Sequence, residues 1–154
     1  MITKATIEQL PLLHACAEEF YAASKHLHLF DLDKFVGLWT DAIESGYGVV
    51  FIAEDNGQIL GTIAGMAHQD IYSSEMVASE FFWFVKESSR GGGIALYRAF
   101  ESWAREQGCK SIQMVHLLDS MPEKVGHFYK RMGFEAVEVR YSKSLEAVTA
   151  QEVA

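Results

Sequence analysis

Cysteine, proline and long apolar runs are all scarce in this sequence. The 154 residues include two cysteines, Cys16 and Cys109, and two prolines. Two cysteines are too few for a disulfide framework, which favours a reducing compartment, and the cytoplasm is the default expectation. No uncharged apolar run reaches the length of a transmembrane helix, and residues 1–4 lack the apolar stretch of a secretory signal. The length fits one domain with an apolar core of its own.

Basic residues are also in the minority. The chain has 13 Lys and Arg residues against 21 Asp and Glu residues, which gives a formal net charge of −8. Such a chain repels phosphate backbones, so a nucleic-acid partner is not expected, and nothing in the hydropathy pattern indicates a membrane partner. The same field attracts cationic molecules, amines among them. The composition therefore favours a small cationic substrate slightly.

The remaining pattern predicts strands and helices in a mixed order. Strands are expected at residues 2–5, 49–54, 58–67, 80–85, 111–117 and 134–145, and helices at 6–23, 33–46, from the glycines at 91–93 to Gly108, and at 120–132. Asp55-Asn56-Gly57 predicts a tight hairpin, and the strand–helix–strand run predicts a parallel pair with a right-handed crossover. The expected fold class is α/β, in the α+β sense of a mixed β-sheet flanked by about four helices. Residues 146–154 are expected to form a flexible tail.

The most specific feature is the segment Arg90-Gly91-Gly92-Gly93-Ile94-Ala95, which lies between a predicted strand and a predicted helix. Glycines let the backbone bend sharply and approach a ligand, and the helix start offers unpaired N–H groups. Together they suit a phosphate or pyrophosphate, and Arg90 can add a charge-assisted contact. The segment lacks the Gly-Lys-Ser/Thr ending of a nucleotide P-loop and the glycine spacing of a dinucleotide fold. A plain strand-to-helix turn is the structural alternative.

Arg90-x-x-Gly93-x-Ala95 resembles the Arg/Gln-x-x-Gly-x-Gly/Ala signature of the GNAT superfamily of N-acetyltransferases. Other segments are similar to that family in the same order: the opening at 2–10, the strand at 82–85, the helix and turn at 99–110, and the Phe-Tyr-x-x-x-Gly-Phe segment at 128–134. The resemblance spans roughly residues 1–145, which we expect to form a single N-acetyltransferase domain with a GNAT-like acyl-CoA N-acyltransferase fold.

The resemblance implies acetyl-CoA as the co-substrate and direct attack of a neutral amine on the thioester, so no enzyme nucleophile is needed. No metal is expected. The implied coenzyme A contacts are main-chain groups of Phe84 and Val85 and the backbone N–H groups of Arg90, Gly91, Gly92, Gly93, Ile94 and Ala95. Ser120 stands where many relatives carry an Asn. It is therefore a candidate for a contact to the cofactor, with helix capping as the alternative.

Two residues are candidates for catalysis. Tyr129 matches the family tyrosine near the thioester sulfur, where it would hydrogen-bond the departing thiolate, and a core aromatic is the alternative. Glu80 is the candidate general base, with a solvated carboxylate or a water chain as alternatives. Strict strand alternation would place Phe82 on the same face as Glu80, where apolar neighbours would raise the pKa of the carboxyl. His116 and His127 could assist a proton path, although a structural role is the commoner one for such residues.

The acceptor pocket is the least specified part of the site. In GNAT folds the loop between the first two helices shapes this pocket, and the candidate walls are Tyr21, His26, His28, Phe30 and Tyr72. His26-x-His28 is not a metal motif, because no nearby residue completes a ligand set. The expected acceptor is a small cationic amine, with a protein lysine or N-terminus as one alternative and a non-catalytic acyl-CoA-binding or interaction module as another. Family members are often dimers, so a homodimer stays open, although the sequence alone reveals no interface.

Overall fold

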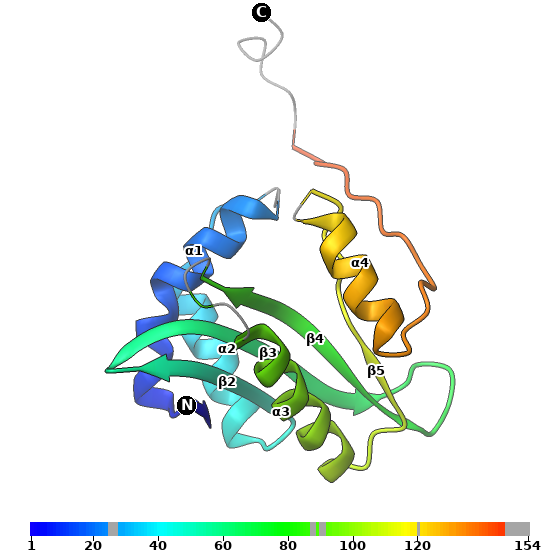
Figure 1. The fold of residues 1–154 in the computed structure, drawn as a ribbon, viewed down its shortest axis with the longest axis horizontal. Coiled ribbons are helices and arrows are strands. Elements are labelled where there is room, and N and C mark those ends of the chain that lie inside the picture. The colour runs from blue at the N-terminus through cyan, green and yellow to red at the C-terminus, as the bar shows by residue number, and fades with distance from the viewer. Residues whose placement is uncertain (25–27, 87–88, 90–91, 120, 147–154) are drawn as a thin grey trace, which may run out of the picture.

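The computed structural model describes residues 1–24, 28–86, 89, 92–119 and 121–146. It is built on one five-stranded sheet with the order β1-β2-β3-β4-β5 (Figure 1). The elements are β1 (Ile2–Lys4), the 3-10 helix η1 (Ile7–Leu13), α1 (His14–Ala23), α2 (Leu32–Glu44), β2 (Gly48–Asp55), β3 (Gln58–Gln69), β4 (Met76–Val85), α3 (Gly92–Glu106), β5 (Ser111–Gln113) and α4 (Pro122–Arg131). The first four strands are antiparallel and β4 and β5 are parallel. The predicted mixed α/β fold is confirmed.

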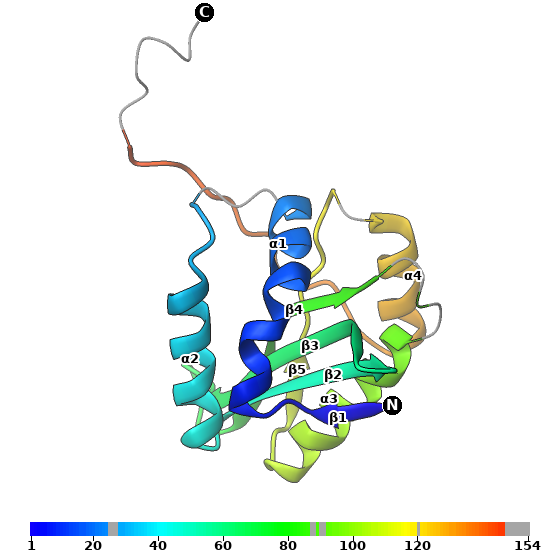
Figure 2. The same ribbon diagram turned by 90° about the vertical axis from the view of Figure 1, so that its left-hand side faces the viewer.

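Helices cover both faces of the sheet. Figure 2 shows η1, α1 and α2 on one face and α3 and α4 on the other. Under α3, Leu96 and Phe100 are fully buried against Ile63 of β3, while under α2 the indole of Trp39 is buried against Val50 of β2. Two apolar layers therefore hold the central strands from both sides and fix where their ends lie.

The first predicted helix is divided into two parts. Thr6 begins it as expected, since its N–H donates to Oε1 of Gln9 at 2.9 Å. However, residues 7–13 form the 3-10 helix η1, and the α-helix begins only at His14. Pro11 explains the division, because it lacks an N–H group and its ring collides with the carbonyl group four residues earlier in an α-helix.

The β2–β3 hairpin has the predicted turn. Asp55 pairs with Gln58, and the two residues between them, Asn56 and Gly57, have φ angles of 51° and 78°. Both angles lie in the left-handed region that Asn and Gly accept most readily, as a two-residue type I′ turn requires.

The β4–β5 pair is shorter than the sequence predicts. Val77–Ser79 pair in parallel with Ser111–Gln113, and β5 ends there, although a strand was expected to continue to residue 117. β4 begins earlier than expected, at Met76, and continues to Val85. Beyond Ser79, within the described part of the chain, β4 has no strand partner on the β5 side. The two strands thus diverge from a common start, as Figure 1 shows.

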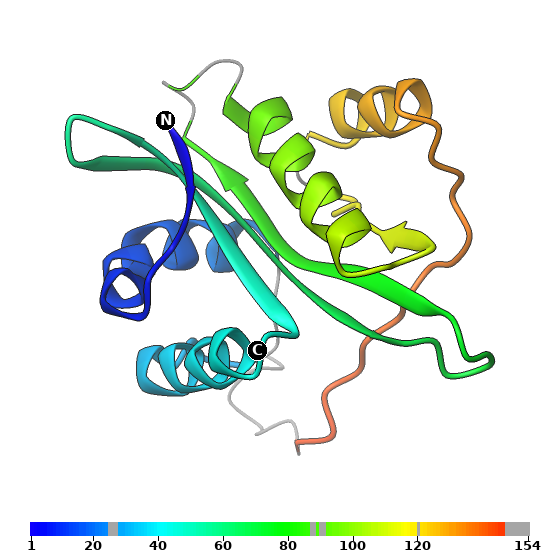
Figure 3. The same ribbon diagram turned by 90° about the horizontal axis from the view of Figure 1, so that it is seen from below.

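The predicted final strand is wrong for this chain taken alone. Residues 134–145 are extended but pair with no strand among the described residues. Figure 1 shows this segment, in orange and red, running beside α4, and Figure 3 shows it leaving the end of α4 and passing the β3–β4 hairpin. Alternation of side chains gives a segment two faces, but a strand also needs a neighbouring edge to supply hydrogen bonds.

Candidate active site

A β-bulge in β4 sets the direction of the candidate base. Gly65 of β3 pairs with Glu80 and Ala64 pairs with Phe82, so Phe81 is an extra residue in β4. The bulge interrupts the alternation of side chains along the strand. Phe82 consequently packs toward α2, with its ring centroid 5.5 Å from that of Trp39, whereas Glu80 lines a separate cavity. The expectation of strict alternation at this point is therefore wrong.

This cavity, of about 60 Å³, lies where β4 and β5 diverge. It is lined by Phe20, Glu80, Trp83, Val115, Leu117, Val125 and Tyr129. These residues come from α1, β4, the segment that follows β5, and α4. Apolar side chains form most of the wall, so the carboxyl and the phenol are in a setting that weakens their contact with water. Both predicted catalytic residues thus line one cavity.

Val115 links these two residues. Its backbone N–H donates to Oε2 of Glu80 at 2.8 Å, and its carbonyl oxygen accepts a hydrogen bond from the hydroxyl of Tyr129 at 2.6 Å. In a longer β5 these backbone groups would be available to a strand ladder. Here side chains bind both of them, which gives a physical reason for the divergence of the chain from β4.

Burial controls the acid–base properties of the pair. Glu80 is 5% exposed and Tyr129 is 8% exposed. Burial raises the pKa of Glu80 to about 8, although the hydrogen bond from the Val115 N–H opposes the rise. Burial, and then the neighbouring Glu80 and Tyr97, raise the pKa of Tyr129 far above its ordinary value. Glu80 can therefore change its protonation state near neutral pH, whereas Tyr129 stays a neutral hydrogen-bond donor.

Trp83 adds a polar group that is not hydrogen-bonded. Its indole Nε1 is buried and has no hydrogen-bond partner among the described residues. The ring lies between the cavity and the start of α3, since its centroid is 6.4 Å from that of Tyr129 and a Cβ added at Gly93 would lie 3.3 Å from its Cζ2 atom. A buried donor without an acceptor is costly, which favours a ligand atom as the missing acceptor.

The start of α3 meets the end of β4. α3 begins at Gly92, and a Cβ added at Gly93 would lie 3.3 Å from both Trp83 and Val85, closer than most side chains are found. Glycine thus lets the helix approach the strand closely. The N–H groups of the first turn, from Gly92 to Ala95, have no acceptor within the helix, although that of Gly92 donates to the Ser89 carbonyl oxygen at 3.4 Å. Arg90, Gly91, Ser120 and His26, also predicted as site residues, lie outside the described residues.

The sequence profile of the acetyltransferase (GNAT) family matches residues 11–134. The chain belongs to the acetyltransferase (GNAT) family. It is an acetyl-CoA-dependent N-acetyltransferase, as the sequence resemblance implied. No curated protein matches the chain in sequence.

Several solved acetyltransferases share its fold. A predicted acetyltransferase from Clostridium acetobutylicum, solved with acetyl-CoA, has a TM-score of 0.74 at 21% identity, covering 94% of this chain and 96% of that chain. An aminoglycoside acetyltransferase from an uncultured soil metagenomic sample, in complex with sisomicin, has a TM-score of 0.72 at 18% identity, covering 95% and 96%. A ribosomal-protein-alanine N-acetyltransferase from Brucella melitensis biovar Abortus 2308 has a TM-score of 0.68 at 12% identity, covering 94% and 99%.

The described residues fit coenzyme A, the co-substrate of a GNAT enzyme. The first turn of α3 can receive a pyrophosphate. The main chain of Phe84 and Val85 lies on the part of β4 that has no β5 partner, where an amide-bearing arm could pair as a strand would. The unpaired Trp83 N–H lies between these two places and the cavity. Ile94 and Ala95 remain predicted contacts through their backbone N–H groups.

The predicted acceptor residues are not all close to the cavity that Glu80 and Tyr129 line. Tyr21 and Phe30 pack against each other with ring centroids 5.9 Å apart, on the α1–α2 side of the sheet. His28 is exposed. Tyr72 is 90% exposed and lies in the turn between β3 and β4, at the opposite end of β4 from Val85. None of these four lines the cavity, and their substrate contacts stay predictions.

Sequence reasoning missed several cavity residues. Val125 could have been found, because it precedes Tyr129 by one helical turn and so lies on the same face of α4. Phe20 and Trp83 could not have been found, because the sequence pattern assigned Phe20 to the core face of a helix and Trp83 to a strand. The two histidines have structural partners: His116 Nε2 lies 2.9 Å from the Pro122 carbonyl oxygen, and His127 Nδ1 lies 2.8 Å from that of Glu123.

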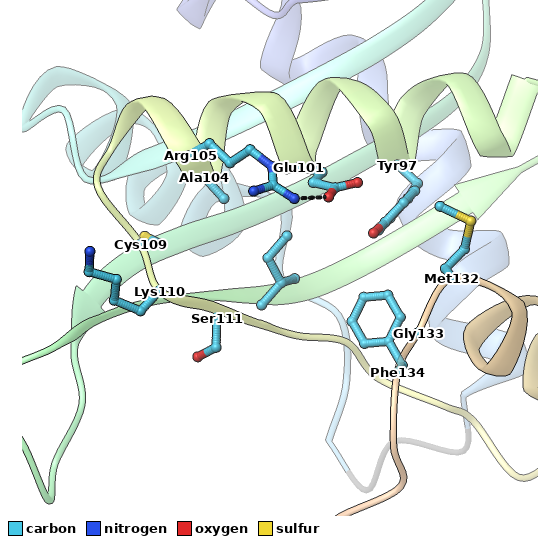
Figure 4. Close-up of a pocket in the computed structure, with 11 residues that line it drawn as sticks. Tyr97, Glu101, Ala104, Arg105, Cys109, Lys110, Ser111, Met132, Gly133 and Phe134 are labelled. Atoms are coloured by element: carbon cyan, nitrogen blue, oxygen red, sulfur yellow. Dashed lines mark hydrogen bonds and ion pairs between the residues drawn. The ribbon is translucent and has the colours of Figure 1, made fainter.

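A larger hollow of about 250 Å³ lies elsewhere, between α3, β5 and the end of α4 (Figure 4). It contains the ion pair between Arg105 and Glu101 at 2.6 Å, and Figure 4 shows Lys110 at its edge. Neither Glu80 nor Tyr129 lines it. Size alone does not identify the catalytic site here, because the smaller cavity holds both candidate catalytic residues.

No helix in the described part of the chain is long and apolar enough to cross a membrane.

Proposed function

We propose that this GNAT enzyme acetylates the primary amine of a small cationic molecule by direct attack, with Glu80 as the general base and Tyr129 as the donor to the departing sulfur. One observation carries the proposal: Glu80 and Tyr129 line the same cavity and are bound to the same residue, Val115. When bound, acetyl-CoA supplies the thioester that the amine attacks and the thiolate that leaves. The first turn of α3 and the open edge of β4 would hold it.

The raised pKa of Glu80 makes the carboxylate a much better base. An alkylammonium has a pKa near 10.4, so moving its proton to an ordinary carboxylate costs about 8 kcal/mol. Moving the proton to a carboxylate with a pKa of about 8 costs about 3 kcal/mol. Burial thus removes more than half of the cost of preparing the nucleophile. The ionised carboxylate would also attract the ammonium form of the substrate into the cavity.

Tyr129 supports the leaving group without giving up its proton. A thiol has a pKa near 8.5, and the phenol is far less acidic, so full transfer of the phenolic proton to sulfur is uphill. A hydroxyl carries one proton, which Tyr129 donates to the Val115 carbonyl oxygen in this structure. Rotation of the hydroxyl would redirect that proton toward the sulfur, and the resulting hydrogen bond stabilises the developing negative charge.

The acceptor class rests on charge. The cavity of about 60 Å³ has room for an amine group of any acceptor, whereas the net charge of −8 attracts cations. The structurally similar aminoglycoside acetyltransferase was solved with sisomicin, which agrees with a small cationic acceptor. The structurally similar ribosomal-protein-alanine N-acetyltransferase favours the alternative, a protein acceptor. Peptide acceptors are therefore included in the experiment below.

An acetyl-CoA thiol-release assay across amine classes tests the proposal. Polyamines, amino acids, aminoglycosides, lysine peptides and peptides with a free N-terminal alanine would be compared at equal concentration. We expect turnover with at least one small amine, and slower turnover with that amine in Glu80→Gln and Tyr129→Phe. Turnover with peptides alone would move the assignment to protein acetylation. Binding of acetyl-CoA without thiol release from any amine would support the non-catalytic acyl-CoA-binding module instead.

A further inference from the structure

His116 is an exposed residue of the segment after β5, and it contacts one face of α4 at three levels. Its Nε2 atom lies 2.9 Å from the carbonyl oxygen of Pro122, and its Cε1 atom would lie 3.3 Å from a Cβ added at Gly126. Its ring is nearly perpendicular to that of Tyr129, with the centroids 6.0 Å apart. Residues four and then three positions apart follow one stripe along a helix. The imidazole therefore packs along the face of α4 that carries Tyr129.

The hydrogen bond between His116 and Pro122 has a fixed direction. A carbonyl oxygen can only accept, so Nε2 of His116 carries the hydrogen and donates it. The neutral ring with this hydrogen and the imidazolium both donate from Nε2. The bond is therefore kept whether the ring is neutral or charged, as a permanent support for the helix requires.

The start of α4 needs such a support. Its N-cap residue, Met121, has φ 43° and ψ 50°, in the left-handed region, and its side chain makes no capping hydrogen bond. This conformation is unfavourable for a residue other than glycine and persists only where the surrounding structure holds it. The bond from His116 to Pro122, the next residue, ties this first turn to the segment after β5.

Gly126 makes room for the imidazole. It lies inside α4, where glycine is less favourable than almost any other residue. A Cβ here would press on the His116 ring, since a separation of 3.3 Å is closer than most side chains are found. An unfavourable helix residue thus stands where it allows His116 to lie against the helix, between the bond to Pro122 and the contact with Tyr129.

The same short segment also holds the hydroxyl of Tyr129. The hydroxyl donates to the carbonyl oxygen of Val115 at 2.6 Å, and Val115 directly precedes His116. Two consecutive residues therefore contact the catalytic phenol, one at its oxygen and the other at its ring. His116 itself does not line the cavity of Glu80 and Tyr129, so it can affect the reaction only through Tyr129 and α4.

We infer that His116 is a positioning residue for the acetyl transfer: it fixes α4 against the segment after β5 and so sets where the Tyr129 hydroxyl lies. The inference rests on the proposed role of Tyr129 as the donor to the departing sulfur. A donor displaced by a fraction of an ångström stabilises the transition state less well, although it binds the ground state much as before. Loss of His116 should therefore appear in kcat and not in the KM for acetyl-CoA.

A double-mutant cycle between His116 and Tyr129 tests the inference. We expect His116→Ala to lower kcat about tenfold, with the KM for acetyl-CoA nearly unchanged. In a Tyr129→Phe background the same substitution should change kcat by less than about twofold, because the donor that His116 positions is already absent. His116→Gln keeps an N–H donor for the Pro122 carbonyl oxygen, so it should recover most of kcat and keep the wild-type pH profile.

His127→Ala is the matched control. His127 is also exposed, and its Nδ1 atom lies 2.8 Å from a carbonyl oxygen in the first turn of α4, that of Glu123. It does not line the cavity, so the variant should turn over like the wild type.

The outcomes separate this inference from the proposed function. Wild-type kcat in His116→Ala, with slow turnover in Tyr129→Phe, overturns the positioning role and leaves the proposed function in place. Equal losses of kcat from His116→Ala in both backgrounds indicate general damage to the fold and overturn the positioning role as well. A limb of the pH profile that disappears in His116→Gln would assign His116 to proton transfer instead. Wild-type turnover in Tyr129→Phe overturns the proposed role of the phenol and this inference together.

Discussion

The carboxylate of Glu80 and the hydroxyl of Tyr129 bind the two backbone groups of one residue, Val115, at 2.8 Å and 2.6 Å. Glu80 belongs to β4 and Tyr129 to α4, so Val115 adds a hydrogen-bonded link between two elements that also meet where Trp83 packs against Tyr129. The carboxyl accepts a hydrogen bond and the phenol donates one. A change at either side chain therefore has consequences for both the chemistry and the local path of the chain.

The pH dependence of turnover tests Glu80 as the base. Because burial raises the pKa of Glu80 to about 8, the carboxylate form grows as pH rises from 6 to 9. We expect kcat/KM for the preferred amine to rise with an apparent pKa near 8 and to fall again as the free ammonium substrate is lost near pH 10. In Glu80→Gln the acidic limb should disappear. A profile that keeps this limb in the variant would assign the base to a water chain instead.

The same ionisation predicts an effect on stability. The folded-state pKa of Glu80 lies above the ordinary value of 4.5. The protonated carboxyl therefore stabilises the fold fully below that ordinary value, and this contribution is lost as pH rises through about 8. Glu80→Gln cannot ionise. The difference between its Tm and the wild-type Tm should therefore increase from pH 5 to pH 9, by an amount that corresponds to a few kcal/mol of unfolding free energy, on the order of 1–5. Thermal unfolding of both proteins across this range measures it.

Equal Tm differences at pH 5 and pH 9 would contradict the buried, neutral state of Glu80. The variant Glu44→Gln is a matched control, because Glu44 is exposed at the end of α2 and should show no such trend.

Tyr129→Phe separates chemistry from cofactor binding. The substitution removes the donor to the departing sulfur but leaves the aromatic ring, so kcat should fall more than about tenfold, or about 1.4 kcal/mol. Calorimetry should find the affinity for coenzyme A nearly unchanged. The variant also leaves the Val115 carbonyl oxygen without its phenol donor, which should lower the free energy of unfolding by about 1 kcal/mol. Turnover at the wild-type rate would remove the phenol from the mechanism.

The sequence predicted the parts of this fold that depend on local signals. Asn56 and Gly57 set a turn through their own backbone preferences, and Tyr129 is recognisable by its motif. The extent of β5 was not predictable in this way, because the strand ends where side chains from β4 and α4 bind Val115. The bulge at Phe81 could not be predicted either, because a bulge is defined by the register between two paired strands.

The C-terminal segment shows a different limit. Its alternation predicts an extended chain correctly, but alternation cannot tell whether a neighbouring edge exists in the same molecule. Residues 134–145 show this directly, because the structure leaves them without a strand partner among the described residues.

The unpaired indole of Trp83 gives a direct spectroscopic test of cofactor placement. The chain has three tryptophans, so a ¹H–¹⁵N spectrum contains three indole signals, and Trp83→Phe identifies the one from Trp83. We expect acetyl-CoA to shift this signal downfield, because a carbonyl oxygen of the ligand supplies the acceptor that the buried Nε1 lacks. Trp39 and Trp103, which are 2% and 3% exposed in the two apolar layers, serve as internal controls.

Loss of the hydrogen bond from the Trp83 indole should weaken the binding of acetyl-CoA. Trp83→Phe keeps an aromatic ring but removes the N–H group, and we expect the Kd for acetyl-CoA to rise about three- to tenfold, as the loss of one hydrogen bond predicts. An unmoved Trp83 signal at a concentration where calorimetry shows saturation would place the ligand away from this indole. In that case the N–H would be accounted for by the ring of Phe128, whose centroid is 5.4 Å from that of Trp83.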